Sequence, residues 1–395
     1  MFIREVKGII TVLCCLCVPL MGADNELPEN LKSLKALAEK GDAGAQNDIG
    51  VIYFYGIGVR RNAKEAKKWF LLASEQGQVD SLFSLGFMYA NGQGVELDSK
   101  EAVKWWRKAA EKGHANAQQN LAVSYSAGKG VQRSSKQAAN WYLKAAEQGH
   151  AQSQFNIGAL YNEGRGVEQN KQEAFKWWSK SAKQGFVEAQ FNLGTAYVSG
   201  RGVKKDEEKA FGWFLKAAEQ GYAPAQHEIG RFFYLGMGVQ KNPVHAYAWF
   251  TISSINGDAK SKQIVGLLAE EMSRDQAEKA KIVAKELCQK NTRLILTETN
   301  KSEPFPNYIS SLRAMANGRS AVAQNEIGQR YANGKGVPKD YVTAYAWFSI
   351  AAINGNALAK KSKPIVAEKM TPTQITKAEA LAKEMIKMNP KLIKK

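Results

Sequence analysis

The stretch ANAQQNLAVSYSAGKGVQRSSKQAANWYLKAAEQG, residues 115–149, is one copy of a unit that recurs along this chain every 36 residues. Its tryptophan and its Gly-x-Gly-Val loop keep that spacing in six consecutive copies. The tryptophans are Trp69, Trp105, Trp141, Trp177, Trp213 and Trp249. A fixed period without slippage is typical of a solenoid built from one stacked unit. We therefore expect a long stacked surface rather than a catalytic pocket.

Each unit contains two amphipathic segments, and no segment alternates with the two-residue period of a strand. In the second copy, small and apolar residues recur at spacings of three and four, which predicts helices near Ser81–Asn91 and Ser99–Glu111. Gly92 follows the first helix, where a left-handed residue ends a helix at little cost. Gly86 lies inside that helix, so we expect close helix contact there to compensate its poor helix propensity. The predicted fold is an all-α solenoid.

These residues carry a family resemblance. The pattern Ala-x-Ala-Gln-x-x-Leu-Gly-x-x-Tyr-x-x-Gly-x-Gly-Val, followed by Ala-x-x-Trp-x-x-x-Ala-Ala-Glu-x-Gly, resembles the Sel1-like repeat, a relative of the tetratricopeptide repeat. The resemblance covers most of residues 43–257 and 321–355. It implies helix-turn-helix units stacked into a right-handed superhelix, and an adaptor that binds protein partners on its concave face. Several secreted bacterial members act in envelope biology or in contact with host cells.

The N-terminus reads as a secretory signal peptide over residues 1–23. Arg4 and Lys7 form a basic start, Gly8–Leu20 is apolar, and the small residues Gly22 and Ala23 offer a cleavage site. The apolar run is short for a bilayer, which disfavours the alternative of a retained membrane anchor. We expect a mature protein that is secreted or periplasmic, with Cys288 as its one cysteine and no disulfide.

A duplication organises the C-terminal half. Ala223–Asn291 aligns without gaps onto Ala321–Asn389, so a repeat and its tail were copied as a block. We therefore divide the mature chain into residues 24–291, six repeats with a lead-in helix and capping helices, and residues 307–390, a second short unit with its own caps. Residues 292–306 are the expected linker, and residues 391–395 form a basic tail. The alternative is that the second unit packs directly on the first cap and continues the superhelix.

The sequence contains no motif that specifies catalysis. The Gly-x-Gly-Val loops follow helices rather than strands, so they do not fit a dinucleotide fingerprint. The four histidines are scattered and show no ligand spacing. Cys288 has no motif partner. We predict a protein that is not an enzyme and binds no cofactor or metal.

Comparison of the copies with one another separates scaffold from surface. Three helix columns vary, at spacings that place them in one stripe on the first helix of each unit. The columns read Asn47, Phe83, Gln119, Phe155, Phe191, His227; then Val51, Phe87, Val123, Ala159, Thr195, Arg231; then Phe54, Ala90, Ser126, Asn162, Val198, Tyr234. By the resemblance this stripe is the concave face. The predicted binding residues are Phe83, Phe87, Gln119, Val123, Phe155, Ala159, Asn162, Phe191, Thr195, His227, Arg231 and Tyr234. The alternative is that the phenylalanines pack between repeats.

The leading functional hypothesis is a monomeric, secreted scaffold that binds another protein, in the manner of family members that contact host cells. The alternative is a periplasmic regulator of cell-wall enzymes. The net charge is +18, and Leu358–Lys395 holds ten lysines against three glutamates. This excess indicates a solvated helix face, or attachment to an anionic membrane or wall polymer. Nucleic acid is not expected, because arginines do not cluster with aromatic residues.

Overall fold

The structure is a computed structural model that describes residues 29–291, 294, 316, 321–334, 337 and 339–393. All regular secondary structure in these residues is helical, which confirms the predicted all-α solenoid. The predicted signal peptide, nearly all of the predicted linker, and Lys394 and Lys395 lie outside the described residues.

Each repeat contributes a first helix, called helix A, and a second, called helix B. The A helices are α3 (Ala43–Tyr55), α5 (Val79–Asn91), α7 (Ala115–Ala127), α9 (Ala151–Glu163), α11 (Val187–Ser199), α13 (Ala223–Leu235) and α18 (Ala321–Asn333). The B helices are α4 (Ala63–Glu75), α6 (Ser99–Glu111), α8 (Ser135–Glu147), α10 (Lys171–Lys183), α12 (Glu207–Ala218), α14 (Pro243–Ile255) and α19 (Tyr341–Ile353). A lead-in helix, α2 (Glu29–Glu39), precedes them. The tails form α15 (Ala259–Glu271) with α16 (Arg274–Lys290), and α20 (Ala357–Ala367) with α21 (Pro372–Met388).

The helix ends follow from local chemistry. Helix α5 ends on Gly92, which has φ 64° and whose N–H bonds to the carbonyl of Met88. Only glycine adopts this left-handed conformation without strain. Helix α6 begins after Asp98, whose carboxylate accepts from two backbone N–H groups of the first turn. The Gly-x-Gly loop thus returns the chain to start helix B beside helix A.

Close packing of A on B explains the glycine inside helix A. A Cβ added at Gly86 would lie 2.4 Å from the indole of Trp106, and one at Gly158 would lie 2.6 Å from Trp178. The large ring of helix B fills the space above the glycine. The expected compensation for the low helix propensity of Gly86 is therefore present.

Buried glutamines tie successive helices together. Gln154 Nε2 donates to the carbonyl of Ala146, 3.0 Å away, and Gln154 Oε1 accepts from Gln184, 2.8 Å away. The same arrangement recurs at Gln46, Gln118 and Gln190. In the second repeat Leu82 and Lys112 replace both members together. Satisfied buried amides fix the register of one repeat on the next.

The two duplicated tails close their arrays in the same way. After α16 the chain returns so that the carbonyl of Leu294 accepts from Gln226 and Asn256. After α21 a short 3₁₀ turn, η3 (Pro390–Leu392), brings the carbonyl of Leu392 to the equivalent Gln324 and Asn354. Each tail thereby covers the end of its last repeat.

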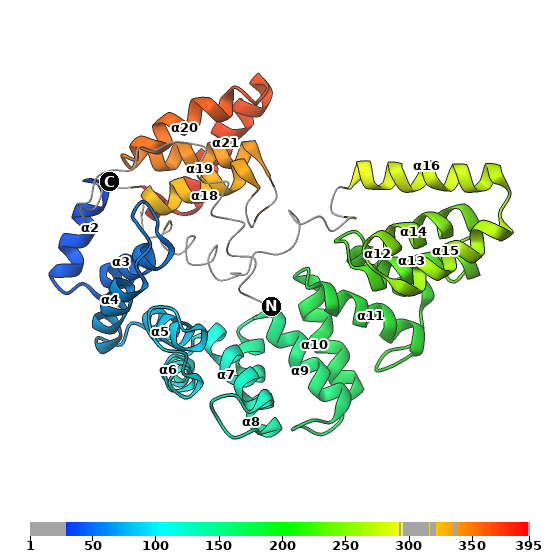
Figure 1. Cartoon of the computed structure of the whole chain (residues 1–395), viewed down its shortest axis with the longest axis horizontal. Coiled ribbons are helices and arrows are strands. Elements are labelled where there is room, and N and C mark those ends of the chain that lie inside the picture. Colours follow the sequence, from blue (N-terminus) through cyan, green and yellow to red (C-terminus); the bar gives the residue numbers. More distant parts are fainter. Residues whose placement is uncertain are drawn as a thin grey trace.

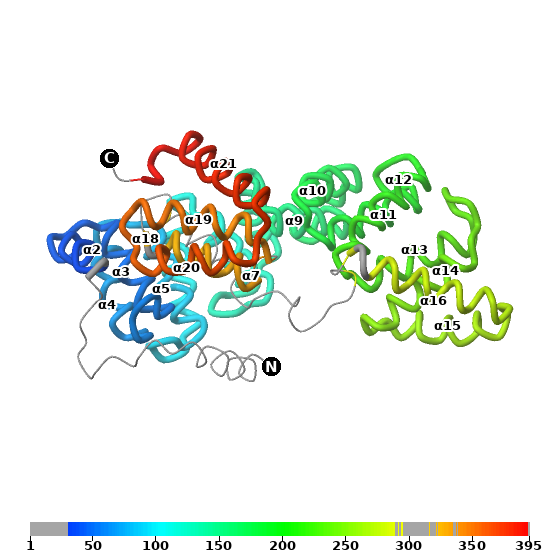
Figure 2. The backbone as a smooth tube through the Cα atoms, turned by 90° about the horizontal axis from the view of Figure 1, so that it is seen from above, coloured from blue at the N-terminus to red at the C-terminus, as the bar shows by residue number. Residues whose placement is uncertain are grey.

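The six N-terminal repeats form an arc, with α3, α5 and α7 on its inner side and α4, α6 and α8 on its outer side (Figure 1). The C-terminal unit, α18–α21, lies beside the start of this arc in both views (Figures 1 and 2). Its residues Ile327 and Trp347 share one hydrophobic cluster with Val51 and Phe54 of the first repeat. The second unit therefore does not stack on α15 and α16, as the continuous-superhelix alternative required.

Candidate functional site

The first column of the helix A stripe packs between repeats. Phe83 stacks on His114, which caps helix A of the next repeat, with ring centroids 4.5 Å apart and planes 17° apart. Phe191 meets Tyr222, the N-cap residue of helix A in the next repeat, with ring centroids 5.4 Å apart. Phe155 lies 5.2 Å from Phe186 in the same relation. These phenylalanines therefore pack between repeats, which was the alternative interpretation of the column. Much of their aromatic surface is covered by neighbouring side chains of the scaffold.

Polar members of this column are bonded across the same junctions. Ser81 Oγ donates to Asn47 Oδ1 at 2.8 Å, and Ser153 Oγ donates to Gln119 Oε1. His227 Nδ1 lies 2.8 Å from Ser261 Oγ. A junction is the contact between helix A of one repeat and the equivalent helix that follows it. In the first six junctions, a polar residue in this column is paired with a serine 34 residues later, and a phenylalanine is paired with an alanine. The pairs are Asn47–Ser81, Phe83–Ala117, Gln119–Ser153, Phe155–Ala189, Phe191–Ala225 and His227–Ser261.

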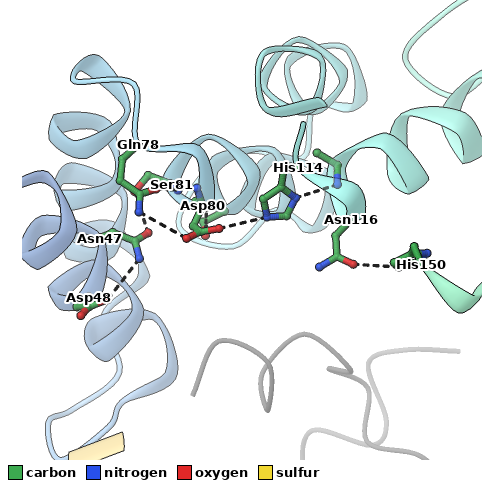
Figure 3. A network of polar contacts seen from close by, with 10 residues as sticks. Asn47, Asp48, Gln78, Asp80, Ser81, His114, Asn116 and His150 are labelled. Carbon is green, nitrogen blue, oxygen red and sulfur yellow. Dashed lines mark hydrogen bonds and ion pairs between the residues drawn. The ribbon is translucent and has the colours of Figure 1, made fainter. Parts of the chain in front are cut away.

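Further polar contacts extend along these junctions (Figure 3). His114 Nε2 lies 3.3 Å from Asp80 Oδ1, and this hydrogen bond holds the pKa of Asp80 below its usual value. His150 Nε2 lies 3.0 Å from Asn116 Oδ1, and burial lowers the pKa of His150. Burial also raises the pKa of Asp48 to about 7, against the opposing effect of its Asn47 partner. The network joins neighbouring A helices at their N-terminal ends.

The C-terminal unit covers the N-terminal part of the stripe. Val51 and Phe54 are buried, and half-buried Phe87 packs on the same cluster as Tyr331 of α18. The equivalent of Val51 in the third repeat, Val123, is 44% exposed. The first repeat's part of the stripe is therefore covered, whereas Val123, Thr195 and Arg231 further along it are exposed.

The exposed face of helix A is rotated from the predicted stripe. Counting from the start of the helix, the stripe uses positions 5, 9 and 12, whereas exposed and half-buried side chains recur at positions 2, 6, 9 and 13. At about 100° per residue, the side chains at positions 5 and 12 lie roughly 40–60° around the helix axis from position 9, on the side of the next repeat. The side chains at positions 2, 6 and 13 lie on the opposite side of position 9. We call the exposed set in repeats 3 to 6 the open ridge: Asn116, Asn120, Val123, Ala127, Gln152, Asn156, Ala159, Glu163, Glu188, Asn192, Thr195, Ser199, Pro224, Glu228, Arg231 and Leu235.

The predicted binding residues therefore divide into three groups. Val123, Ala159, Thr195 and Arg231 lie on the open ridge. Asn162 and exposed Tyr234 lie beside it, in the third column. The rest lie in junctions or under the C-terminal unit: Phe83, Phe87, Gln119, Phe155, Phe191 and His227.

A cavity of about 240 Å³ opens on the ridge between α9 and α11. Phe155, Ala159 and Trp178 form its apolar side. Asn162 and Asn192 place amide groups in it. The cavity is further lined by Glu163, Thr195, Ala196 and Arg201. Its mixed lining suits one side chain of a ligand held along the ridge.

One buried polar atom that lines this cavity lacks a partner among the described residues. Asn162 Oδ1 is buried and accepts no hydrogen bond, whereas Trp178 Nε1 is satisfied by the carbonyl of Phe155 at 3.2 Å. Arg201 forms no ion pair with any described residue, and Glu163, which also lines the cavity, pairs with Arg165. The exposed guanidinium of Arg201 is thus left available to a ligand.

Family comparison agrees with this architecture. The Sel1 repeat profile matches residues 43–78, 79–114, 115–150, 151–186, 187–222, 223–258 and 321–356. The chain belongs to the Sel1 repeat family. The seven matched repeats are the seven A–B helix pairs of the structure.

Two solved Sel1 repeat structures show how far the likeness extends. A protective antigen from uropathogenic Escherichia coli is 30% identical, with 93% of this chain and 89% of that chain covered and a TM-score of 0.50. A Sel1 repeat protein from Oxalobacter formigenes is 32% identical, with 57% of this chain and 97% of that chain covered and a TM-score of 0.49. No curated protein matches the sequence.

Sequence reasoning missed several residues of the Sel1 repeat surface. Arg201 occupies the variable position of a Gly-x-Gly loop, which the sequence pattern indicates only as a turn. Asn192 belongs to a fourth variable column, Asp48, Ser84, Asn120, Asn156, Asn192 and Glu228. The variation in that column was a usable signal.

Other kinds of site are not evident in the Sel1 array. The described residues contain no group of three or more histidines, cysteines or carboxylates placed to hold a metal. None of the described helices is long and apolar enough to cross a membrane. Cys288, on α16, is half-buried, and burial raises the pKa of its thiol.

Proposed function

We propose that this Sel1 repeat protein is a non-enzymatic scaffold that binds a protein partner along the open ridge of repeats 3 to 6. The observation that carries the proposal is the uneven coverage of helix A. The C-terminal unit covers the face in the first two repeats, whereas Val123, Thr195 and Arg231 stay exposed in line beyond it. The cavity between α9 and α11 gives that accessible surface one recessed point.

Site-specific crosslinking tests this proposal. A photoreactive residue placed at Val123 or Thr195 should trap a discrete protein adduct in the native cell. Leu72 is the control position, because it is 44% exposed on α4, a B helix on the outer side of the arc. Equal adducts from Leu72 and from the ridge would show that the partner does not select this face.

The replacement of Phe155 and Phe191 by serine does not isolate binding. Both rings pack against the aromatic residue that precedes helix A of the next repeat, so their removal damages two junctions. A charge introduced at an exposed ridge position leaves the junctions intact. Val123→Glu with Thr195→Glu should abolish partner capture while the helical circular dichroism signal stays unchanged.

We further propose that the chain is exported and acts outside the cytoplasm, in contact with another cell. The predicted signal peptide at residues 1–23 and the likeness to a protective antigen of uropathogenic Escherichia coli support this proposal. Fractionation of the native host into periplasm, envelope and medium distinguishes it from a periplasmic regulator of cell-wall enzymes. Retention in the cytoplasm would contradict both.

The lysine-rich C-terminal segment supports a second, charge-driven attachment to an anionic surface. Lys360, Lys361, Lys377, Lys383 and Lys387 are exposed on α20 and α21. Binding to vesicles that contain anionic lipid should weaken with added salt and on replacement of Lys391, Lys394 and Lys395 by glutamine. Binding that is insensitive to salt would exclude this role.

A further inference from the structure

The B helices carry a regular row of exposed lysines. In four consecutive repeats a lysine lies three residues after the repeated tryptophan. The four are Lys108, Lys144, Lys180 and Lys216, on α6, α8, α10 and α12. We propose that this lysine row binds an anionic polysaccharide. The open ridge lies on A helices and the lysine-rich segment at the C-terminus, so the inference goes beyond the proposed function.

Each lysine of the row is held in place by its tryptophan. The ammonium groups of Lys108, Lys144, Lys180 and Lys216 lie 4.5, 4.3, 4.0 and 4.2 Å from the ring centroids of Trp105, Trp141, Trp177 and Trp213. A cation above an aromatic face is attracted to the ring. The contact restricts a flexible side chain while its charge stays exposed, so less conformational entropy is lost when an anion binds.

The fold does not require lysine at these positions. The equivalent residue is Leu72 in the first repeat and Ile252 in the sixth, three residues after Trp69 and Trp249. Leu72 is 44% exposed, so even an exposed position accepts an apolar side chain. Packing on tryptophan therefore does not explain the choice of a charged residue in repeats 2 to 5.

The row also differs from other lysines on the same helices. Four of those pair with a carboxylate three residues earlier in the chain: Glu65–Lys68, Glu101–Lys104, Glu173–Lys176 and Asp206–Lys209. The lysines of the row form no ion pair with any residue that the structure describes. Glu111, Glu147 and Glu219 follow three of them at the same interval but do not pair with them. The charge of the row is thus left for something outside the scaffold.

Charge on the helices is divided between the two layers of the array. In the first five repeats, the A helices contain four acidic residues and no lysine or arginine. The B helices contain fifteen lysines and arginines, with three on α4, four on α6, two on α8, four on α10 and two on α12, against eight acidic residues. An anionic partner is therefore attracted to the B helices and repelled by the A helices.

The path of the row favours a flexible chain over a flat membrane. Helices α6 and α8 lie on the outer side of the arc in Figure 1, whereas α10 and α12 lie above α9 and α11 in Figure 2. The row therefore winds with the superhelix, and a plane can touch only part of it. A flexible linear polymer can follow its whole length.

The chemistry of the row favours a polysaccharide over a nucleic acid. Lysines on separate helices are about 8–10 Å apart or more, because helix axes do not approach more closely. A nucleic-acid strand carries a charge about every 3.4 Å, and aromatic rings commonly stack on its bases. Trp141 and Trp177 are 7% and 8% exposed and cannot stack in this way. A polysaccharide with carboxylate or sulfate groups, separated by uncharged ring atoms, suits the spacing better.

The test uses heparin, a linear sulfated polysaccharide, with the full chain, and uncharged dextran as its control. The row variant combines Lys108→Gln, Lys144→Gln, Lys180→Gln and Lys216→Gln. It should bind heparin about 10- to 100-fold more weakly, since an exposed ion pair contributes a few tenths of a kcal/mol to about 1 kcal/mol and 1.4 kcal/mol is tenfold. The slope of log affinity against log salt should become shallower by about three, at roughly 0.7–0.9 per contact. Arginine at the same four positions keeps the charge and should bind normally.

A matched variant controls for net charge. It changes the four ion-paired lysines of the same helix layer to glutamine, Lys68, Lys104, Lys176 and Lys209, and so removes the same charge as the row variant. It should lose less than about threefold, because its remaining effect on the row is screened by salt. Equal losses in the two variants, or equal binding of dextran and heparin, would overturn the lysine row.

Acetylation of lysines in the natural chain measures the contact without any variant. Heparin should protect the four row lysines, whereas Lys68 and Lys176 should react as before. Protection spread over both sets would overturn the row even if the row variant failed to fold. Binding of single-stranded DNA or anionic vesicles that was as tight and as dependent on the row would overturn the assignment to a polysaccharide. Val123→Glu with Thr195→Glu should leave heparin binding unchanged, so the open ridge is tested separately.

Discussion

A pair exchange at the junction of repeats 3 and 4 tests how the first column is built. Gln119 accepts a hydrogen bond from Ser153, and both side chains are buried. The junction one repeat earlier uses Phe83 and Ala117 at the same positions, with His114 where this junction has His150. The double change Gln119→Phe with Ser153→Ala therefore copies an existing junction into its neighbour.

The structure sets the expected magnitudes. Ser153→Ala alone leaves Gln119 Oε1 buried without its donor, which should cost about 1–3 kcal/mol. Gln119→Phe alone removes the acceptor of the Ser153 hydroxyl and adds volume, which should cost about 1–3 kcal/mol. The double variant removes both polar groups and lets the introduced phenylalanine ring stack on His150. We expect it to lie within about 1 kcal/mol of the natural chain, with a coupling energy of about 1–3 kcal/mol.

Urea unfolding gives the midpoint of each variant, and hydrogen exchange of α7 and α9 reports the junction itself. The local measurement is needed because long arrays need not unfold in a single step. In the single variants, exchange should accelerate in these two helices before the rest of the array. If the double variant instead lost the sum of the stabilities lost by the two single variants, a Phe–Ala pair could not replace a polar–serine pair at this junction. That result would refute the proposed pairing of the two positions.

Three further predictions follow from burial. Trp141→Ala should lower the free energy of unfolding by about 3–5 kcal/mol, because Trp141 is 7% exposed in mid-array; an unchanged denaturant midpoint would contradict this. Gly158→Ala should destabilise the fourth repeat, since the new Cβ meets the Trp178 ring, and a normal thermal midpoint would show that the ring can move. Burial lowers the pKa of His150, so its contribution to stability is present above about pH 6.5 and is lost as pH falls. His150→Asn should therefore flatten the pH dependence of unfolding between about pH 7 and pH 5, and a parallel profile would exclude His150 as its source.

The repeat period predicts most of the fold. It places the second helix of repeat 2 at Ser99–Glu111, as observed, and the role expected for Gly86 is explained by contact with Trp106. Such features recur in every copy because each repeat must solve the same packing problem. A single sequence with internal repeats therefore contains its own comparison.

The candidate binding face was harder to predict, because a helix column can vary for two reasons. Columns vary where a partner binds, and they also vary where two positions change together across a junction. Asn47 with Ser81, and Phe83 with Ala117, show the second cause, which examination of single columns does not reveal. Pairs at a separation of 34 residues would have identified the first column as a junction. The fourth variable column, which runs from Asp48 to Glu228 and shows no such pairing, would then have emerged as surface.

The repeat period could not predict where the C-terminal unit packs. Its cluster with Val51 and Phe54 joins surfaces that have no equivalent elsewhere in the array. Repeats predict how neighbours in the chain stack, but they do not indicate which distant unit returns to the beginning.

The contact between the C-terminal unit and the first repeats depends on the two being joined in one chain. Within one chain, the C-terminal unit meets the first repeats at an effective concentration set by the connecting segment, so dilution of the protein does not weaken the contact. Proteolytic cleavage between residues 291 and 321 would make the same contact bimolecular. The C-terminal unit would then leave as the sample is diluted and would uncover Val51, Phe54 and Phe87. A single cut would thus lengthen the accessible inner face by two repeats.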